Sequence, residues 1–330
     1  MGKLTDRELK QLLSCIRKNE QVIVPPKSGY DSGVHKIGDK YLVVSTDPCS
    51  GVPSRWFGFL LINYAASDVA LFGARPEYCT INLLGPPGTR SEIFQEIMEQ
   101  ACEAANELGT LIITGHTGRY DSLNNTIGVC TAYGTVEPEN LKTPGSAQSK
   151  DLILCTKPIG LETAVNFSLT HTAQAVDLFS KQSTTRLSKE VRMQSCVKEA
   201  LQLAELKSVH AMHDATEGGL IAALNEVASA SNLGFKINYE RIPLTREVRI
   251  LQEAFGLSDN QVLAMSSTGT ILAAVSSEGE NEVRDILNRM GLEARFLGEF
   301  MEDKKKLLIQ NNQEQSFPKV ADDPYTRILS

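Results

Sequence analysis

The strongest constraint on the fold is one amphipathic helix that lies between two short apolar runs. Residues 91–108 carry apolar side chains at helical spacing along one stripe, and Gly109 directly after them is a typical helix stop. Residues 77–84 before this helix and residues 110–115 after it are apolar runs of the kind that form buried strands. A strand, a helix and a second strand in this order predict an α/β fold.

The first part of the chain is expected to form a four-stranded sheet with helices on one face. Two further apolar runs, residues 41–48 and 126–136, complete the four strands. Helices are expected over residues 5–18, where a threonine and a glutamate match a capping box, and over residues 55–72. Residues 24–35 contain a proline pair and are expected to form a loop.

A polar segment with two prolines, residues 137–150, divides the chain. We therefore expect an N-terminal domain of residues 1–145 and a larger C-terminal α/β domain of residues 146–330. Residues 310–330 are polar and are expected to pack loosely. The second domain again alternates apolar runs with amphipathic segments, with strands expected over residues 151–156, 235–239 and 270–275 and helices over residues 188–204, 220–230, 246–255 and 281–290.

Composition argues against several classes of partner. The net charge of −7 comes without a block of basic residues, so the chain lacks the electrostatic footprint of a nucleic-acid-binding protein. The seven cysteines are scattered without a CxxC pair, which is typical of core residues in a reducing compartment and not of a zinc site. Because the chain has neither an apolar signal region nor an apolar run of about twenty residues, we expect a cytoplasmic protein without a membrane span.

Residues 208–220 have the pattern of a phosphate-binding turn. An apolar strand ends at His213 and Asp214, and Gly218 and Gly219 lead into a helix, whose free N–H groups favour an anion. The carboxylate of Asp214 would repel a phosphate unless a divalent cation lay between them, so the pattern indicates Mg²⁺ with a nucleotide or a phosphorylated substrate. Ordinary turn chemistry is the alternative interpretation.

Three aspartates in the first part of the chain are further candidates. Asp31 lies between Gly29 and Gly33 in a polar loop, which is either a phosphate or metal loop or a plain surface loop. Asp47 ends an apolar run, which is the usual place for a functional carboxylate in α/β proteins. Asp68 interrupts an apolar helix, where aspartate is unfavourable, so it either faces solvent or is held inward by a partner such as a metal.

Seven short segments resemble the AIR synthase (PurM) superfamily of ATP-dependent enzymes. They occur in the order of the family and are spread over both halves of the chain. It is this order, more than any one segment, that makes the resemblance specific. The segments are residues 29–33, 45–48, 66–76, 115–117, 133–136, 159–163 and 213–219.

The resemblance implies a two-domain PurM-like fold. The N-terminal four-stranded sheet would pair with the sheet of a second subunit to form a barrel, and the C-terminal domain would be a larger α/β domain. ATP would lie near the dimer interface, with Mg²⁺ bound by Asp31, Asp47 and Asp68. The residues implied to contact the nucleotide are these three aspartates together with Gly29, Gly33, Gly115, His116, Thr117, Gly218 and Gly219.

The implied chemistry is transfer of the γ-phosphoryl group of ATP to an oxygen of an amide, a carboxylate or a similar acceptor, which activates that oxygen as a leaving group. A kinase of the thiamine-monophosphate kinase type and a non-catalytic nucleotide-binding relative are the alternatives. Such a reaction asks the protein mainly for positioning and charge neutralisation. Asp214 and His213 are the implied catalytic residues, with His213 as a general base or a substrate contact. His116 stands where several relatives have aspartate.

The turn at residues 212–219 is most similar to that of the hydrogenase-maturation (HypE) branch of the superfamily. Proteins of that branch end in a cysteine whose thiol carries the carbamoyl group that is dehydrated. This chain ends in Ser330, and a serine hydroxyl is a much poorer nucleophile than a thiolate near neutral pH. We therefore predict that the protein does not act on its own terminus. The expected partners are a small molecule or a protein tail as acceptor and a second copy in a homodimer.

Overall fold

The computed structural model describes Leu4 and residues 6–330. By its internal contacts the chain divides into two compact units. The smaller unit comprises Ile16–Pro26 and Asp31–Leu141, and the larger one comprises the described residues up to Cys15, Lys27–Tyr30 and Lys142–Ser330. The capping box predicted at Thr5 lies outside the described residues. The division of the chain into domains at residue 145 stays a prediction.

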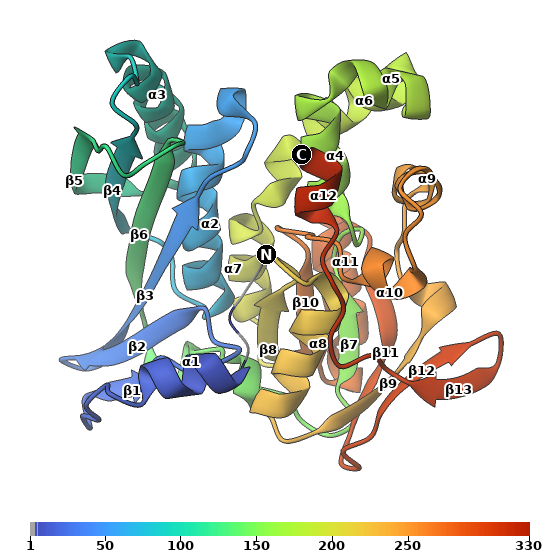
Figure 1. The fold of residues 1–330 in the computed structure, drawn as a ribbon. Coiled ribbons are helices and arrows are strands. Elements are labelled where there is room, and N and C mark those ends of the chain that lie inside the picture. The colour runs from blue at the N-terminus through green and yellow to red at the C-terminus, as the bar shows by residue number, and fades with distance from the viewer. Residues whose placement is uncertain (1–3, 5) are drawn as a thin grey trace. The chain divides into compact units, whose positions relative to one another are not determined.

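The smaller unit contains a six-stranded sheet (Figure 1). Its strand order is β1-β2-β3-β6-β4-β5, and only β4 and β5 run parallel. The four predicted strands are all present within it. The six strands are β1 (Val22–Val24), β2 (Ser32–Ile37), β3 (Lys40–Cys49), β4 (Tyr78–Gly85), β5 (Leu111–Arg119) and β6 (Ile127–Val136).

The prediction of only four strands was wrong, because residues 24–35 are not a loop throughout. The proline pair does end β1, as expected, but the chain resumes extended structure at Ser32. Strand β2 then turns back into β3 at Gly38, whose φ of 58° is in the left-handed region that favours glycine. This turn makes a hairpin that extends the sheet beyond the predicted four strands.

Helices α2 (Phe57–Leu71) and α3 (Ser91–Leu108) cover one face of this sheet, as predicted (Figure 1). Helix α2 packs on β3 and β6, and α3 packs on α2. The two helices approach closely at Gly58, where an added Cβ atom would lie 2.2 Å from the carbonyl oxygen of Ile97. Helix α3 ends at Gly109 in the left-handed conformation, which confirms the predicted stop.

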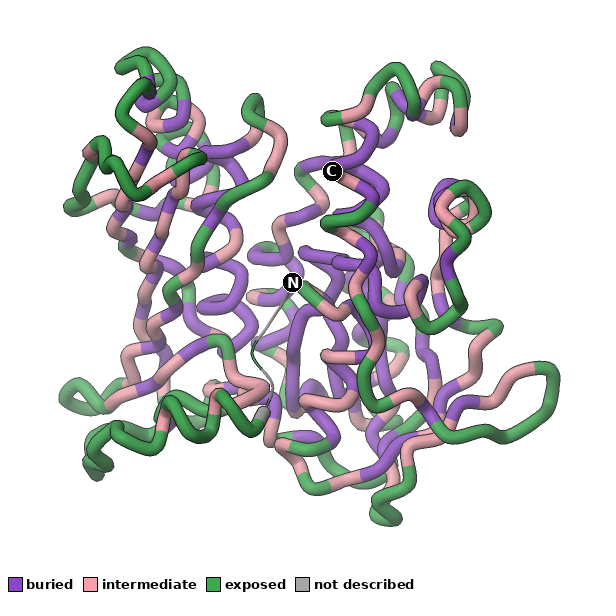
Figure 2. The backbone as a smooth tube through the Cα atoms, in the orientation of Figure 1, coloured by how far each residue is buried: buried purple, intermediate pink, exposed green. Residues whose placement is uncertain are grey.

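The larger unit contains a seven-stranded sheet of order β13-β12-β9-β11-β7-β10-β8. Strand β8, which carries His213 and Asp214, is an edge strand that pairs only with β10. Strand β10 is buried at every residue (Figure 2). The strands are β7 (Leu152–Cys155), β8 (Val209–Asp214), β9 (Gly234–Asn238), β10 (Ile271–Val275), β11 (Arg295–Met301), β12 (Lys306–Gln310) and β13 (Gln313–Ser316).

The helices of the larger unit pack around this sheet, and α8 forms part of its main apolar core. None of the helices in the described part of the chain combines the length and the hydropathy that a membrane crossing requires. The helices are α1 (Asp6–Leu13), α4 (Leu161–Thr170), α5 (Thr172–Phe179), α6 (Lys181–Lys189), α7 (Val197–Ala204), α8 (Gly219–Ala230), α9 (Arg246–Ala254), α10 (Asp259–Leu263), α11 (Glu280–Arg289) and α12 (Tyr325–Leu329).

Two predicted helices are shorter than expected. The helix predicted over residues 188–204 is broken between α6 and α7, because the Lys157 ammonium binds the carbonyl oxygens of Met193 and Ser195, each at 2.8 Å. The first helix ends at Leu13 and not near residue 18, since the Ser14 hydroxyl donates to a carbonyl oxygen of the last turn at 2.6 Å.

The prediction of a loosely packed tail was also wrong. Residues 310–330 form β13 and α12, and the side chains of Phe317 and Ile328 are buried in the larger unit. The polar composition did not predict this packing, because the tail is held mainly by hydrogen bonds and not by a long apolar stripe.

Candidate functional site

Two of the three candidate aspartates of the smaller unit meet at the hydroxyl of Ser45 on β3. The Ser45 Oγ atom lies 2.7 Å from Oδ2 of Asp68 and 3.1 Å from the main-chain carbonyl oxygen of Asp31. Asp47 follows two residues further along β3, so its side chain leaves the strand on the same face as Ser45. The fold therefore places the main chain of Asp31 and the carboxylate of Asp68 at one hydroxyl, with Asp47 on the adjoining stretch of the strand.

Asp68 points into the unit and not toward solvent. Its residue is 4% exposed within α2, and Ser45 donates a hydrogen bond to its carboxylate. Of the two alternatives that the sequence left open, the solvent-facing one is thus excluded. Asp31 is exposed and Asp47 is half-buried. Carboxylate oxygens of this kind are the ligands that Mg²⁺ prefers, so the donor set fits that ion.

The thiol of Cys130, beside Asp47 in the sheet, is not a nucleophile. Cys130 on β6 is the register partner of Asp47 and is fully buried. A hydrogen bond with Cys79 and burial raise the pKa of the Cys130 thiol, and the negative charge of Asp47 raises this pKa further. A thiol held neutral in this way is inert.

Gly115, His116 and Thr117 do not join the aspartates within one chain. A single cross-strand row runs from Asp47 on β3 through Cys130 and Ile81 to Gly115 on β5. Three inter-strand steps separate the ends of this row, which is roughly 14 Å at about 4.8 Å a step. His116 is exposed, and its Nε2 atom lies 2.7 Å from the hydroxyl of Tyr120.

In the larger unit, His213 and Asp214 are buried at the end of β8. The Nδ1 atom of His213 donates a hydrogen bond to the main-chain carbonyl oxygen of Asp214, at 2.8 Å. The Nε2 atom lies 3.1 Å from Oε2 of Glu226 on α8. Both ring nitrogens of His213 are therefore oriented by neighbours, and Glu226 faces the nitrogen that would move a proton.

The Asp214 carboxylate is the least satisfied charged group of this region. The residue is 2% exposed, and its Oδ1 atom finds no hydrogen-bond partner among the described residues. His213 Nδ1 lies 3.7 Å from this oxygen, too far for a hydrogen bond. A buried carboxylate oxygen in such surroundings costs free energy unless a cation or a donor reaches it. The donor chemistry again fits Mg²⁺.

Glu226 was not predicted as a site residue. Its side chain packs against Gly29, which was predicted. Gly29 has a φ of 75°, and an added Cβ atom would lie 3.1 Å from Cβ of Glu226. Residue 29 therefore packs directly over the acid that faces His213. The available signal was a lone acid in an otherwise apolar helix, the same signal that marked Asp68. Gly33 has ordinary strand geometry in β2, and an added Cβ atom would lie 3.6 Å from the carbonyl oxygen of Val24, an ordinary contact.

The paired glycines at the start of α8 have structural reasons of their own. An added Cβ atom at Gly219 would lie 2.5 Å from the carbonyl oxygen of Met265, and Gly218 has a φ of 85°. The N–H of Gly218 donates to Oδ2 of Asp323 at 3.1 Å. One N–H group that was predicted to bind phosphate therefore donates to a carboxylate of the chain itself. A phosphate contact at this turn stays a prediction.

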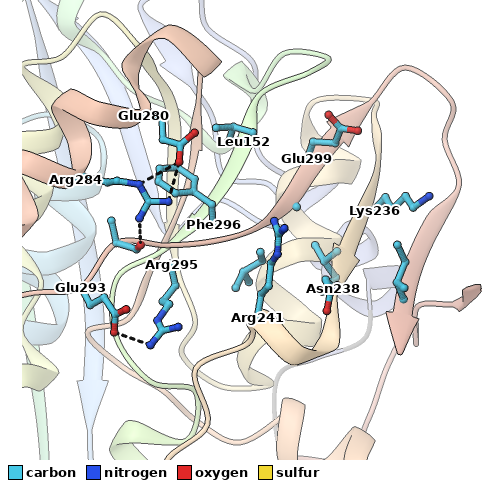
Figure 3. A pocket seen from close by; sticks show the side chains of 15 residues that line it. Leu152, Lys236, Asn238, Arg241, Glu280, Arg284, Glu293, Arg295, Phe296 and Glu299 are labelled. Carbon is cyan, nitrogen blue, oxygen red and sulfur yellow. Dashed lines mark hydrogen bonds and ion pairs between the residues drawn. The ribbon is translucent and has the colours of Figure 1, made fainter. Parts of the chain in front are cut away.

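A pocket of about 620 Å³ lies elsewhere on the larger unit, along β9, β11 and α11 (Figure 3). None of the described residues that line it was a predicted site residue. Four of its charged groups neutralise one another, because Arg284 binds Glu280 at 2.7 Å and Arg295 binds Glu293 at 2.8 Å. Paired charges of this kind leave little field for a polyphosphate.

Both parts of the chain match models of one protein family. The model described as AIR synthase related protein, N-terminal domain, matches residues 29–136, and the model of the C-terminal domain matches residues 148–310. The chain therefore belongs to the AIR synthase related family, and the predicted PurM-like α/β fold is confirmed.

Curated relatives of this chain carry the names of hydrogenase formation proteins and of selenide, water dikinases. A hydrogenase expression/formation protein of Methanocaldococcus jannaschii is 27% identical, over 85% of this chain and 82% of that protein. The carbamoyl dehydratase HypE of Cupriavidus necator is 27% identical, over 76% and 69%. A selenide, water dikinase of a Shewanella species is 27% identical, over 84% and 83%.

Solved structures share the fold over nearly the whole chain. The hydrogenase maturation protein HypE in complex with ATP has a TM-score of 0.72 at 18% identity, covering 97% of this chain and 91% of that one. A HypE–HypF complex gives 0.71 at 17% identity, covering 96% and 99%. The thiamine monophosphate kinase of Aquifex aeolicus gives 0.68 at 17% identity, covering 92% and 97%.

Proposed function

We propose that the protein is an ATP- and Mg²⁺-dependent enzyme that transfers the γ-phosphoryl group to an oxygen of an amide, a carboxylate or a similar acceptor. The observation that carries this proposal is the buried Oδ1 atom of Asp214, which has no hydrogen-bond partner among the described residues. Such an atom is costly in a purely structural role and is expected where a cation binds.

Asp31, Asp47 and Asp68 would hold Mg²⁺ through their carboxylate oxygens. Asp214 would be a catalytic residue, with a cation beside its buried carboxylate. The bound ion would neutralise charge on the phosphates. His213 would contact the acceptor or move a proton through its Nε2 atom, which lies 3.1 Å from Glu226. The nucleotide contacts of Gly29, Gly33, Gly115, His116, Thr117, Gly218 and Gly219 belong to the same proposal.

Relatives and structural neighbours support this reading of the chemistry. Two curated relatives carry enzyme names, carbamoyl dehydratase and selenide, water dikinase, and one structural neighbour is a HypE with ATP. A neighbour that is a HypE–HypF complex supports a protein partner. The acceptor in this proposal is a protein tail or a small molecule. The same proposal places the protein in the cytoplasm, since seven cysteines scattered without a CxxC pair are typical of a reducing compartment.

The second candidate is a small-molecule kinase, which the thiamine monophosphate kinase neighbour favours. A chromatographic assay of the products separates the two reactions. A phosphorylated acceptor indicates the kinase, and free phosphate together with a dehydrated or otherwise condensed acceptor indicates the activating enzyme. ATP that stabilises the protein without ADP release for any acceptor indicates a non-catalytic relative.

Replacing Asp47 with asparagine tests the metal assignment. We expect ADP release to fall by roughly 100-fold or more, since electrostatic groups of this kind carry effects of that size. Asp39→Asn is the matched control, because Asp39 is an exposed aspartate at the turn before the same strand. Full activity of Asp47→Asn would refute the role of this carboxylate.

Wild-type protein is also expected to gain about 2.7 kcal/mol of stability when ATP and Mg²⁺ are at 100 times the dissociation constant.

We also propose a homodimer, formed through the face of the smaller sheet that α2 and α3 leave open. One cross-strand row on this face contains Leu111, Tyr78, Tyr133 and Val44. Leu111 is 62% exposed and Tyr78 is 40% exposed. Apolar side chains in a row on an open sheet face are typical of an interface between protein chains.

Leu111→Glu should convert the dimer into a monomer, because it replaces the most exposed apolar side chain of this row with a charge. Sedimentation velocity at micromolar protein measures the change. Leu12→Glu is the matched control, since Leu12 is 58% exposed on α1 in the other unit. A wild-type monomer, or a dimer that survives Leu111→Glu, would rule out this interface.

A further inference from the structure

The carboxylate of Asp323 in the C-terminal tail is held by four donors. Its Oδ2 atom accepts from the Ser266 hydroxyl at 2.7 Å and from the N–H of Gly218 at 3.1 Å. Its Oδ1 atom accepts from the N–H of Tyr325 at 2.9 Å and from the N–H of Ser266 at 3.4 Å. Three of these donors come from the body of the larger unit, so they form a carboxylate-binding site that exists apart from the tail.

Two separate segments build this site. Gly218 is the residue before the first turn of α8, where the helix dipole favours an anion. Ser266 follows α10 and contributes both its amide and its hydroxyl. A hydroxyl and two amides that converge on one carboxylate are a stronger arrangement than a helix end alone, because hydrogen bonds to a charged acceptor are the strong ones.

The residues that follow Asp323 lie against α4. The Tyr325 hydroxyl accepts from Nδ2 of Asn166 at 2.9 Å, and Asn166 in turn accepts from Nε2 of Gln194 at 2.9 Å. Nε2 of His171 lies 3.3 Å from the carbonyl oxygen of Leu329. These contacts give the tail end one definite position on the body.

The stretch just before Asp323 lies at the surface, with Ala321 packed against the apolar core. Val320 is 84% exposed, and the nearby main chain is tied to α8 chiefly by Nδ2 of Asn225, which donates to the carbonyl oxygen of Pro318 at 3.0 Å. The tail therefore crosses the surface as a strap whose far end is fixed at Asp323.

We propose that Gly218 and Ser266 form a carboxylate-binding site that latches the C-terminal segment 324–330 onto α4 through Asp323. The site is a general one for small carboxylates, and the tail excludes them by occupying it. The inference does not depend on the proposed ATP chemistry, because its test follows the tail and needs neither nucleotide nor turnover.

Hydrogen exchange followed by mass spectrometry tests the latch on the full chain. In Asp323→Ala we expect the amides of residues 325–329 to exchange at least tenfold faster than in wild type. Asp322→Ala is the matched control, because Asp322 is the exposed neighbour of Asp323. Ser266→Ala removes the hydroxyl donor from the other side and should also speed exchange of the tail. Unchanged exchange of residues 325–329 in both Asp323→Ala and Ser266→Ala would overturn the latch.

Sodium formate probes the site itself. Formate should raise the thermal midpoint of Asp323→Ala above the midpoint in sodium chloride of equal ionic strength, and it should not do so for wild type, whose site is filled. The doubly changed protein, Asp323→Ala with Ser266→Ala, should lose this response. An equal response to formate and chloride in Asp323→Ala would show that the donors do not bind a free carboxylate and would overturn that part of the proposal.

Discussion

Asp214→Asn is expected to abolish ATP turnover and to leave the folded protein at least as stable as wild type. The reason is that Oδ1 of Asp214 is buried without a hydrogen-bond partner among the described residues, so removal of its charge relieves a cost of folding. Loss of activity together with unchanged or higher stability is the signature of a residue kept for function. ADP release and the midpoint of urea unfolding measure the two effects.

Asp151 provides a matched control for this experiment. It is an equally buried aspartate of the same unit, but Nδ1 of His210 and the N–H of Gln148 bind its carboxylate at 2.9 Å and 2.7 Å. Asp151→Asn should therefore lose about 1–3 kcal/mol of stability and keep its activity. If Asp214→Asn loses as much stability as Asp151→Asn, or retains turnover, the proposed role of Asp214 is wrong.

Lys157→Met is expected to have the largest effect on stability, a loss of about 3–5 kcal/mol. The Lys157 ammonium lies beside the Glu199 carboxylate and also binds the carbonyl oxygens of Met193 and Ser195, and both charged side chains are nearly fully buried. Removal of the lysine leaves Glu199 as an unpaired buried charge. Urea unfolding of the variant measures the loss.

A double-mutant cycle separates the charge effect from the lost packing. Lys157→Met combined with Glu199→Leu should recover much of the stability, since no unpaired charge remains. Lys305→Met is a surface control, because Lys305 pairs with Asp303 at 3.2 Å with both side chains well exposed, and it should cost no more than about 1 kcal/mol. A loss that is the same with and without Glu199→Leu would contradict the assigned role of the buried charge.

The parts of the fold that sequence predicted well are those with local causes. Helix α3 has the predicted bounds because its apolar period and its glycine stop are both local signals. The break between α6 and α7 could not be predicted, because it depends on Lys157, which lies more than thirty residues earlier in the chain. The hairpin of β2 and β3 was missed because a proline pair nearby dominated the local pattern.

The same distinction applies to the candidate site. Asp47 and Asp68 stood out as acids within apolar segments, and the inward orientation of Asp68 required the hydroxyl of Ser45, a contact between distant parts of the chain. Asp323 was not predicted, because its donors on Gly218 and Ser266 lie more than fifty residues away. Glu226 had a signal, a lone acid in an apolar helix, which the sequence analysis did not use.

The edge position of β8 has a consequence for how this family can diversify. Because β8 pairs with β10 alone among the described strands, an insertion or deletion in the turn after Asp214 disturbs one strand pair of the sheet, together with the contacts of Ala215 and Gly218 to Ser267 and Asp323. Evolution can therefore shift or lengthen this turn while the interior of the sheet stays intact. Related proteins that keep the same scaffold could in this way come to accept acceptors of different sizes.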